Sequence, residues 1–306
     1  MVCSFQNVKN RQRLILSDKE NFIMEYITLN NGIKMPQLGL GVMEIENGAA
    51  GEQVILDALE AGYRMIDTAT VYFNEATVGN AIRKSGIPRE EIFVTSKFWA
   101  QDAGYENTKK AFELSLKNLG FDYLDMYLVH VPFGDYYGSW RAMEELYAQG
   151  KIRAIGVCNF YPARLADLCM NVNVKPAVCQ VEMHPFYQQK EAIQNMHNFE
   201  VQPEAWSPLA HGRYNIFSNE VLKSIGSKYG KSVSQVVIRW NIQRGVAVIP
   251  KSVKKERIIE NFNVWDFVLT DEDMRKIAEL DLGYTEAEDP TALETAIGAN
   301  QWKIHD

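Results

Sequence analysis

Two kinds of hydrophobic pattern alternate along this chain. In residues 107–119, Phe112, Leu116 and Leu119 fall on one face of a helix that Gly120 ends. Residues 63–69 contain the apolar pair Met65-Ile66, and apolar residues alternate with polar ones in residues 123–130, as in β-strands. The pattern therefore predicts that strands and helices follow one another over most of the chain.

Strand and helix alternate eight times in roughly 230 residues, which favours a (β/α)8 TIM barrel, an α/β fold, over an open doubly wound sheet. The predicted strands are residues 38–42, 63–69, 92–97, 123–130, 152–157, 177–183, 203–206 and 246–250. The predicted helices are residues 52–60, 75–85, 107–119, 139–149, 162–170, 188–198, 219–229, 233–244 and 256–262.

The first part of the chain differs from this repeating pattern. Residues 26–36 predict a β-hairpin with an Asn31-Gly32 turn, which we expect to cap the bottom of the barrel. Residues 1–23 have no sustained periodicity, and we expect a disordered or loosely docked extension there. No shift in composition divides the remainder, so we predict a single domain over residues 24–306.

Composition excludes several classes of function. The net charge of −7 argues against a nucleic-acid surface, and no apolar run approaches the roughly 20 residues of a membrane helix. The four cysteines lack CxxC spacing, so we expect free thiols and a cytoplasmic, reducing location. We also expect no metal site, since no ligand spacing connects the histidines at positions 184, 197, 211 and 305.

Polar residues come at or just after the ends of consecutive predicted strands. Asp67, Lys97 and His130 end three of them, and Tyr72 follows Asp67 by five residues. In a TIM barrel the carboxyl ends of the strands carry the catalytic groups. Each residue alone has an ordinary structural alternative: a helix cap, a half-buried loop aromatic, a surface lysine and a satisfied histidine at the barrel rim. Together they predict a site.

These four side chains suit proton donation to a carbonyl group. A phenol near pKa 10 is a poor acid at neutral pH, and we expect the ammonium of Lys97 to lower the pKa of Tyr72. Asp67 would keep the lysine charged and in place. A neutral His130 would orient the substrate carbonyl.

Five motifs resemble signatures of the aldo-keto reductases, in that family's order, within about residues 24–285. They are Tyr63-Arg-Met-Ile-Asp-Thr-Ala69 with Tyr72 and Asn74-Glu75, Ser96-Lys97, Leu128-Val-His130, Lys151-Ile-Arg-Ala-Ile-Gly-Val-Cys-Asn-Phe160, and Ile249-Pro-Lys-Ser252 with Arg257-Ile-Ile-Glu-Asn261. The resemblance implies a TIM barrel that reduces aldehydes and ketones with NADPH, using the Asp67, Tyr72, Lys97 and His130 tetrad. Related double-bond reductases carry Glu at the position of His130, so carbonyl reduction is favoured.

The resemblance also implies a set of NADPH contacts. Asn159 and Gln180 match carboxamide ligands, and Trp206 matches an aromatic that stacks on the nicotinamide. Lys251, Ser252 and Arg257 match a cluster for the 2′-phosphate, although a solvated basic turn is the alternative there. The remaining implied contacts are Gly41, Val42, Met43, Asp67, Cys158, Ser207, Leu209, Val253, Glu260 and Asn261.

Several residues depart from the family pattern. Cys158 and Cys179 replace a usual Ser and Asn near the carboxamide, and Val131 and Met43 replace aromatics that commonly wall the substrate pocket. We therefore expect a wider or differently shaped pocket. Its predicted walls are Trp99, His130, Phe133, Tyr136 and Tyr137.

We predict an NADPH-dependent oxidoreductase that reduces small aldehydes, α-dicarbonyls or keto-sugars as a monomer, with no nucleic-acid or membrane partner. The competing class is an NADPH-binding regulatory or structural protein of the same fold. The intact set of four polar residues argues against that alternative.

Overall fold

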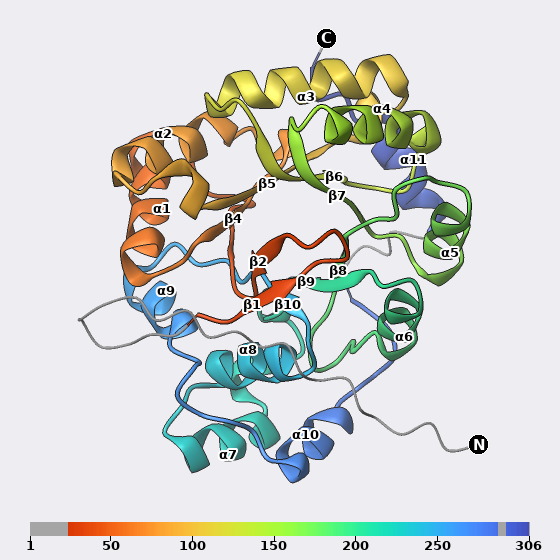
Figure 1. The fold of residues 1–306 in the computed structure, drawn as a ribbon. Helices are drawn as coiled ribbons and strands as arrows, with labels where there is room; N and C mark the ends of the chain where they lie inside the picture. Colours follow the sequence, from red (N-terminus) through yellow and green to blue (C-terminus); the bar gives the residue numbers. More distant parts are fainter. Residues whose placement is uncertain (1–23, 287–291, 306) are drawn as a thin grey trace.

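The computed structural model describes residues 24–286 and 292–305, so the predicted extension at residues 1–23 lies outside the described residues. Eight parallel strands follow one another in sequence order around a barrel (Figure 1). A parallel bridge between Leu38 and Val248 joins the first strand to the last, and Gly39 N donates to Val248 O at 2.8 Å. The predicted TIM barrel is therefore confirmed. The strands are β3 (Leu40–Gly41), β4 (Met65–Asp67), β5 (Phe93–Phe98), β6 (Leu124–Val129), β7 (Ile152–Cys158), β8 (Val178–Glu182), β9 (Gln202–Trp206) and β10 (Ala247–Val248).

Helices surround the barrel in the ring seen in Figure 1. Glycines in the left-handed conformation end several of them, as Gly120 does after α3, because a residue without Cβ adopts positive φ at little cost. The helices are α1 (Ala49–Ala61), α2 (Glu75–Ser85), α3 (Tyr105–Leu119), α4 (Tyr136–Ala148), α5 (Pro162–Met170), α6 (Lys190–Asn198), α7 (Glu220–Tyr229), α8 (Val233–Gln243), α9 (Lys255–Phe262), α10 (Asp271–Ala278) and α11 (Leu293–Gln301).

Most predicted elements occur within a few residues of their expected places, and two helices were missed. Helix α10 is largely polar, but Thr270 and Asp273 form a reciprocal capping box that stabilises its first turn. Helix α11 is short and buries only Ala299 among its residues. The predicted strands were generally too long, as residues 246–250 contain only the two residues of β10, because apolar residues continue into buried loops. None of the described helices is long and apolar enough to span a membrane.

The hairpin of β1 (Tyr26–Thr28) and β2 (Lys34–Pro36) caps the amino ends of the barrel strands, as predicted (Figure 1). Asn31 Nδ2 donates to Arg153 O near the start of β7, and Asn30 Nδ2 donates to Pro176 O before β8, both at 2.9 Å. Met35 is fully buried and belongs to the apolar cluster inside the barrel. The hairpin therefore closes the bottom, and the opposite end is left for the site.

Candidate active site

The structure brings the four predicted polar residues together at the carboxyl ends of the strands. Asp67 ends β4, Lys97 lies in β5, His130 follows β6, and Tyr72 lies in the short 3-10 helix η1 (Thr70–Tyr72). Lys97 Nζ is 2.5 Å from Asp67 Oδ1 and 5.1 Å from the centre of the Tyr72 ring. The rings of Tyr72 and His130 meet edge to face, with centroids 5.6 Å apart.

Lys97 and Asp67 form a fully buried ion pair. Burial by itself lowers the pKa of Lys97, but the charge of Asp67 and its hydrogen bond to the ammonium act in the opposite direction, and the pKa is raised above its ordinary value. Lys97 Nζ also donates to Thr68 O at 3.0 Å. The lysine therefore remains an ammonium at neutral pH, as the chemistry of the site requires.

Tyr72 corrects one expectation. Lys97 does lower the pKa of Tyr72, but burial of the phenol is the larger effect and raises that pKa to about 12. The negative charge of Asp67 acts in the same direction as burial. Tyr72 is therefore fully protonated at neutral pH and holds a proton that it can give away.

His130 is a buried, neutral imidazole. Burial and the charge of Lys97 hold its pKa well below the usual range. Its Nδ1 is buried and makes no hydrogen bond to any described residue. Trp99 contacts the ring edge to face at 5.3 Å. A buried nitrogen without a partner beside a proton donor suits contact with a polar atom of a ligand.

Hydrogen bonds to Asn74 hold the loop that carries Tyr72. Thr68 Oγ1 donates to Asn74 Oδ1 and Asn74 Nδ2 donates to Val42 O, both at 2.7 Å. On the other side, Thr70 Oγ1 donates to Lys97 O at 3.1 Å. The loop is thereby tied to β3 and β5, which fixes the position of the phenol.

A second polar chain crosses the barrel interior from Asp67. Gln180 Nε2 donates to Asp67 Oδ2 at 3.0 Å and to Glu204 Oε2 at 2.8 Å. Burial is the main cause that raises the pKa of Glu204 to about 7, and the charge of Asp67 adds to it. Glu204 was not among the predicted site residues. The signal that could have found it is a carboxylate in the middle of a strand that is mostly apolar.

Asn159 joins the predicted stacking aromatic to the tetrad. Trp206 Nε1 donates to Asn159 Oδ1 at 3.0 Å, and Asn159 Nδ2 donates to His130 O at 3.2 Å. Asn159 has a positive φ of 61°, which costs energy for a residue with a side chain. Trp206 thus supplies an N–H group that helps to hold this strained residue.

The predicted phosphate cluster lies where β10 leads into α9. Lys251 and Arg257 are exposed, and Lys251 Nζ lies 3.2 Å from Glu44 Oε2. Val253 is also exposed. Two cations beside a hydroxyl at the start of a helix suit an anion.

Other observations also fit a bound dinucleotide. Ser207 Oγ is buried without a hydrogen-bond partner in the described chain, and Ser207 has a φ of 50°. Gly41, by contrast, is explained by packing within the barrel, because a Cβ there would lie 2.9 Å from Ile249 O. We consider that the residues present fit NADPH.

The remaining predicted cofactor residues differ in how far they are exposed to solvent. Val42 and Asn261 are buried, Leu209 is half-buried, and Met43 is exposed. Cys158 Sγ lies 3.7 Å from Gln180 Oε1 inside the barrel. Glu260 accepts a hydrogen bond from Ser232 Oγ, so this carboxylate already has a partner at the start of α8.

An apolar cluster covers the predicted substrate side of Tyr72. Trp99 and Phe133 belong to it, together with Val131 and Ala299 of α11. Trp302, just after α11, meets Trp99 at 5.2 Å, and sequence reasoning missed it. The sequence signal that could have found it is an aromatic residue near the end of the chain. Helix α11 and the residue after it therefore cover this pocket wall.

Tyr136 and Tyr137 lie outside that cluster. Tyr136 packs edge to face on Phe160 of the main hydrophobic core at 5.2 Å. Tyr137 donates its hydroxyl to Asp167 Oδ2 of α5 at 2.6 Å. The structure thus joins Trp99, Phe133 and His130 around Tyr72 and leaves these two tyrosines apart from them.

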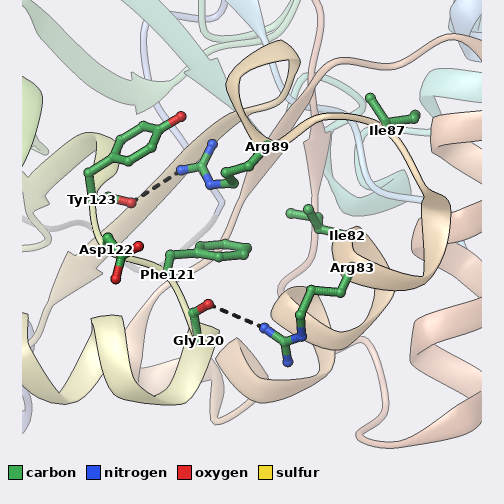
Figure 2. A pocket seen from close by; sticks show the side chains of 8 residues that line it. All are labelled: Ile82, Arg83, Ile87, Arg89, Gly120, Phe121, Asp122 and Tyr123. Atoms are coloured by element: carbon green, nitrogen blue, oxygen red, sulfur yellow. Dashed lines mark hydrogen bonds between the residues drawn. The ribbon is translucent and has the colours of Figure 1, made fainter.

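A groove of about 400 Å³ lies at the other end of the barrel (Figure 2). Its two arginines are already engaged: Arg89 pairs with Asp125 at 2.7 Å and donates to Tyr123 O, and Arg83 donates to Leu119 O. Figure 2 shows the arginines turned toward the loop that starts at Gly120. The groove lies between two helix–strand loops, and none of the four tetrad residues lines it.

Comparisons with known proteins identify the family of this chain. The family model described as "Aldo/keto reductase family" matches residues 37–282. Glyoxal reductase of Bacillus subtilis (strain 168) is 50% identical over 259 residues, which are 84% of this chain and 93% of the relative. The 9,11-endoperoxide prostaglandin H2 reductase of Trypanosoma cruzi (strain CL Brener) is 50% identical over 256 residues, covering 83% and 90%.

Solved structures give the same result. An aldo-keto reductase of Bombyx mori, crystallised in complex with NADP, superposes with a TM-score of 0.81 at 32% identity, over 86% of this chain and 94% of that chain. The fold, the family model and the relatives all indicate the same family. The chain therefore belongs to the aldo-keto reductase family, whose reaction is the NADPH-dependent reduction of aldehydes and ketones.

Proposed function

We propose that this protein reduces small aldehydes and α-dicarbonyls, with Tyr72 as proton donor and NADPH as hydride source. The observation that carries the proposal is the protonated phenol of Tyr72 between the buried Lys97–Asp67 pair and a neutral His130. All four groups lie at the end of the barrel where this fold holds its active sites. The reaction class follows from the family, and the residue roles are our proposal.

Each residue has a distinct task in the proposed mechanism. Bound NADPH would supply the hydride, and a carbonyl oxygen that gains alkoxide character is more basic than a phenolate. Tyr72 gives its proton to that oxygen, so a pKa of about 12 does not prevent the transfer. Lys97 stabilises the tyrosinate that remains, and Asp67 holds the ammonium in place. His130 offers a hydrogen bond to the carbonyl oxygen and thereby orients it.

The chain's own residues provide the proposed cofactor site. Asn159 and Gln180 would hold the carboxamide, Trp206 would stack on the nicotinamide, and Lys251, Ser252 and Arg257 would bind the 2′-phosphate. The other proposed contacts are Gly41, Val42, Met43, Cys158, Ser207, Leu209, Val253, Glu260 and Asn261. The unpartnered Ser207 Oγ supports this assignment.

The choice of small substrates rests on the pocket and on one relative. Trp99, Phe133 and Val131 are packed closely with the C-terminal Ala299, which leaves an enclosed apolar surface beside Tyr72. The name of the Bacillus subtilis relative, glyoxal reductase, also supports a small substrate. We further propose that reduction, not alcohol oxidation, is the working direction.

We also propose a cytoplasmic monomer with residues 24–306 as a single domain. Cys158, Cys169 and Cys179 are free and buried, which supports a reducing compartment. Light scattering of the purified protein would measure its mass in solution, and a dimer would contradict the monomer.

The test measures NADPH and NADH consumption with glyoxal, methylglyoxal and larger aldehydes, for wild type and Tyr72→Phe. We expect NADPH-selective turnover that Tyr72→Phe abolishes, with NADPH binding unchanged. Turnover that survives in Tyr72→Phe would overturn the role of the phenol. Tight binding without turnover of any carbonyl would favour a regulatory NADPH-binding protein, and no binding would refute the cofactor assignment.

A further inference from the structure

Glu204 is a buried carboxylate to which the mechanism above assigns no role. It lies in β9 directly opposite Gln180 of β8 and is 1% exposed. Its Oε2 accepts a hydrogen bond from Gln180 Nε2 at 2.8 Å. Burying a carboxylate is costly unless it makes a specific contact, so the contact with Gln180 requires an explanation.

The amide of Gln180 has one donor end and one acceptor end, and its surroundings distinguish them. Asp67 and Glu204 both contact the same end, at 3.0 and 2.8 Å. Asp67 is an ionised acceptor beside Lys97, and an amide oxygen facing it would be repelled. The end between the two carboxylates is therefore the NH2 group, and both of its hydrogens are used.

The opposite end, Gln180 Oε1, is consequently held as an acceptor. Its contact in the barrel is the weak donor Cys158 Sγ at 3.7 Å. A thiol leaves capacity for a stronger N–H donor at that oxygen. The carboxamide of a nicotinamide presents such a donor.

We propose that Glu204 is a positioning residue that fixes the Gln180 amide with its oxygen directed to the carboxamide N–H of the bound nicotinamide. The inference rests on the proposed cofactor site, in which Gln180 holds that carboxamide. Glu204 itself touches neither substrate nor cofactor in this scheme. Its contribution is the second acceptor that prevents the amide of Gln180 from turning over.

The accepting oxygen of Glu204, and not its negative charge, is the essential part of this proposal. The charged groups that act on Glu204 are Asp67 and Lys97. Glu204→Gln retains an oxygen that can face Gln180 Nε2 without the charge. Glu204→Met fills a similar volume and removes the acceptor.

The experiment measures binding of NADP+ and of 3-acetylpyridine adenine dinucleotide phosphate by isothermal titration calorimetry. The analogue carries a methyl group in place of the carboxamide NH2 and cannot donate to Gln180 Oε1. We expect wild type to prefer NADP+ by about threefold to tenfold, the effect of one hydrogen bond. Glu204→Met should lose that preference by weakening NADP+ alone, and Glu204→Gln should keep it.

Glu75→Gln is the matched control, because Glu75 is also buried and hydrogen-bonded, to Ser96 and Asn118, but lies outside the barrel. We expect it to keep the wild-type preference. Thermal unfolding without cofactor checks that each variant is folded, and Glu204→Leu replaces Glu204→Met if the latter does not fold.

An unchanged preference in folded Glu204→Met would overturn the proposal, as would an equal loss in Glu204→Gln, which would indicate a role of the charge. Failure of wild type to bind either nucleotide would instead refute the proposed cofactor site. A wild type that binds both equally would show that Gln180 Oε1 accepts no hydrogen bond from the carboxamide, and this too would overturn the inference.

Discussion

The two ends of the barrel interior are built from the same strands and differ completely in chemistry. At the amino end, Met65 and Phe93 pack with Met35 of the hairpin in an apolar cluster. Two and four residues further along the same strands, Asp67 and Lys97 form a buried ion pair. The comparison teaches that one end of the strands stabilises the fold and the other places charges that cost stability and serve the site.

The contrast depends on the two-residue period of a strand. Side chains two residues apart point to the same side, so Met65 and Asp67 both face the interior while Ile66 joins the outer core. A single strand can therefore supply a structural residue at one end and a polar one at the other. Changes at the two ends should have separable effects on unfolding and turnover.

Lys97→Met should have the largest effect. It leaves Asp67 buried without its cation, and we expect about 3–5 kcal/mol loss in the free energy of unfolding and at least about 100-fold loss of kcat. Urea unfolding and steady-state kinetics would measure both. The double variant Asp67→Asn/Lys97→Met should regain much of the stability but none of the activity; recovered turnover would contradict our assignment.

Met35→Ala tests the opposite end. Removing this fully buried side chain should lower the free energy of unfolding by about 2–5 kcal/mol, because a cavity remains under the hairpin. We expect kcat/KM to stay near wild type at temperatures where the variant is folded. The exposed Leu114→Ala serves as the control with little loss. A specific loss of kcat in Met35→Ala would mean that the two ends are coupled.

The pH dependence of stability should reveal the buried Glu204. Its pKa is raised to about 7 from an ordinary 4.5, so between those values the folded state holds a proton that the unfolded state has lost. This contribution to stability is complete below about pH 4.5 and is lost as pH rises through 7, by about 3 kcal/mol. Glu204→Gln should remove that slope when unfolding is measured from pH 5 to 8. An identical slope in both proteins would refute the titration.

Arg257→Ala should have the smallest effect and change only cofactor choice. Loss of one charged hydrogen bond costs about 1.5–3 kcal/mol, so NADPH binding should weaken about 10- to 100-fold while NADH binding is unchanged. Fluorescence titration would measure both affinities. Arg141→Ala, on the exposed side of α4, is the matched control. Equal losses for NADPH and NADH would exclude a contact of Arg257 with the 2′-phosphate.

Sequence reasoning worked best where the information is local. The period of apolar residues located the strands and nine of the helices, and the Asn31-Gly32 turn located the hairpin. It failed at α11, whose short segment has no clear amphipathic pattern. It also misjudged the pKa of Tyr72, because the degree of burial decides whether desolvation or Lys97 dominates.

The tetrad could be predicted because a barrel brings strand ends together, so Asp67, Lys97 and His130 needed no contact information beyond their places in the pattern. The pocket walls could not be assigned in this way. Tyr136 and Tyr137 look as suitable as Trp99 in the sequence, but the Tyr137 hydroxyl donates a hydrogen bond to Asp167 of α5. Which face of a loop or helix an aromatic occupies depends on packing.

By itself the sequence determined the alternation of strands and helices, the barrel and the chemical character of its carboxyl end. Only the tertiary structure decided which polar groups meet inside the barrel. The amide of Gln180 donates to Asp67, which is 113 positions away in the chain, and also to Glu204. Trp302 covers Trp99 in the same way. The physical reason is that local propensity acts over a few residues, whereas burial, partners and pKa values depend on groups that only the closed barrel brings into contact.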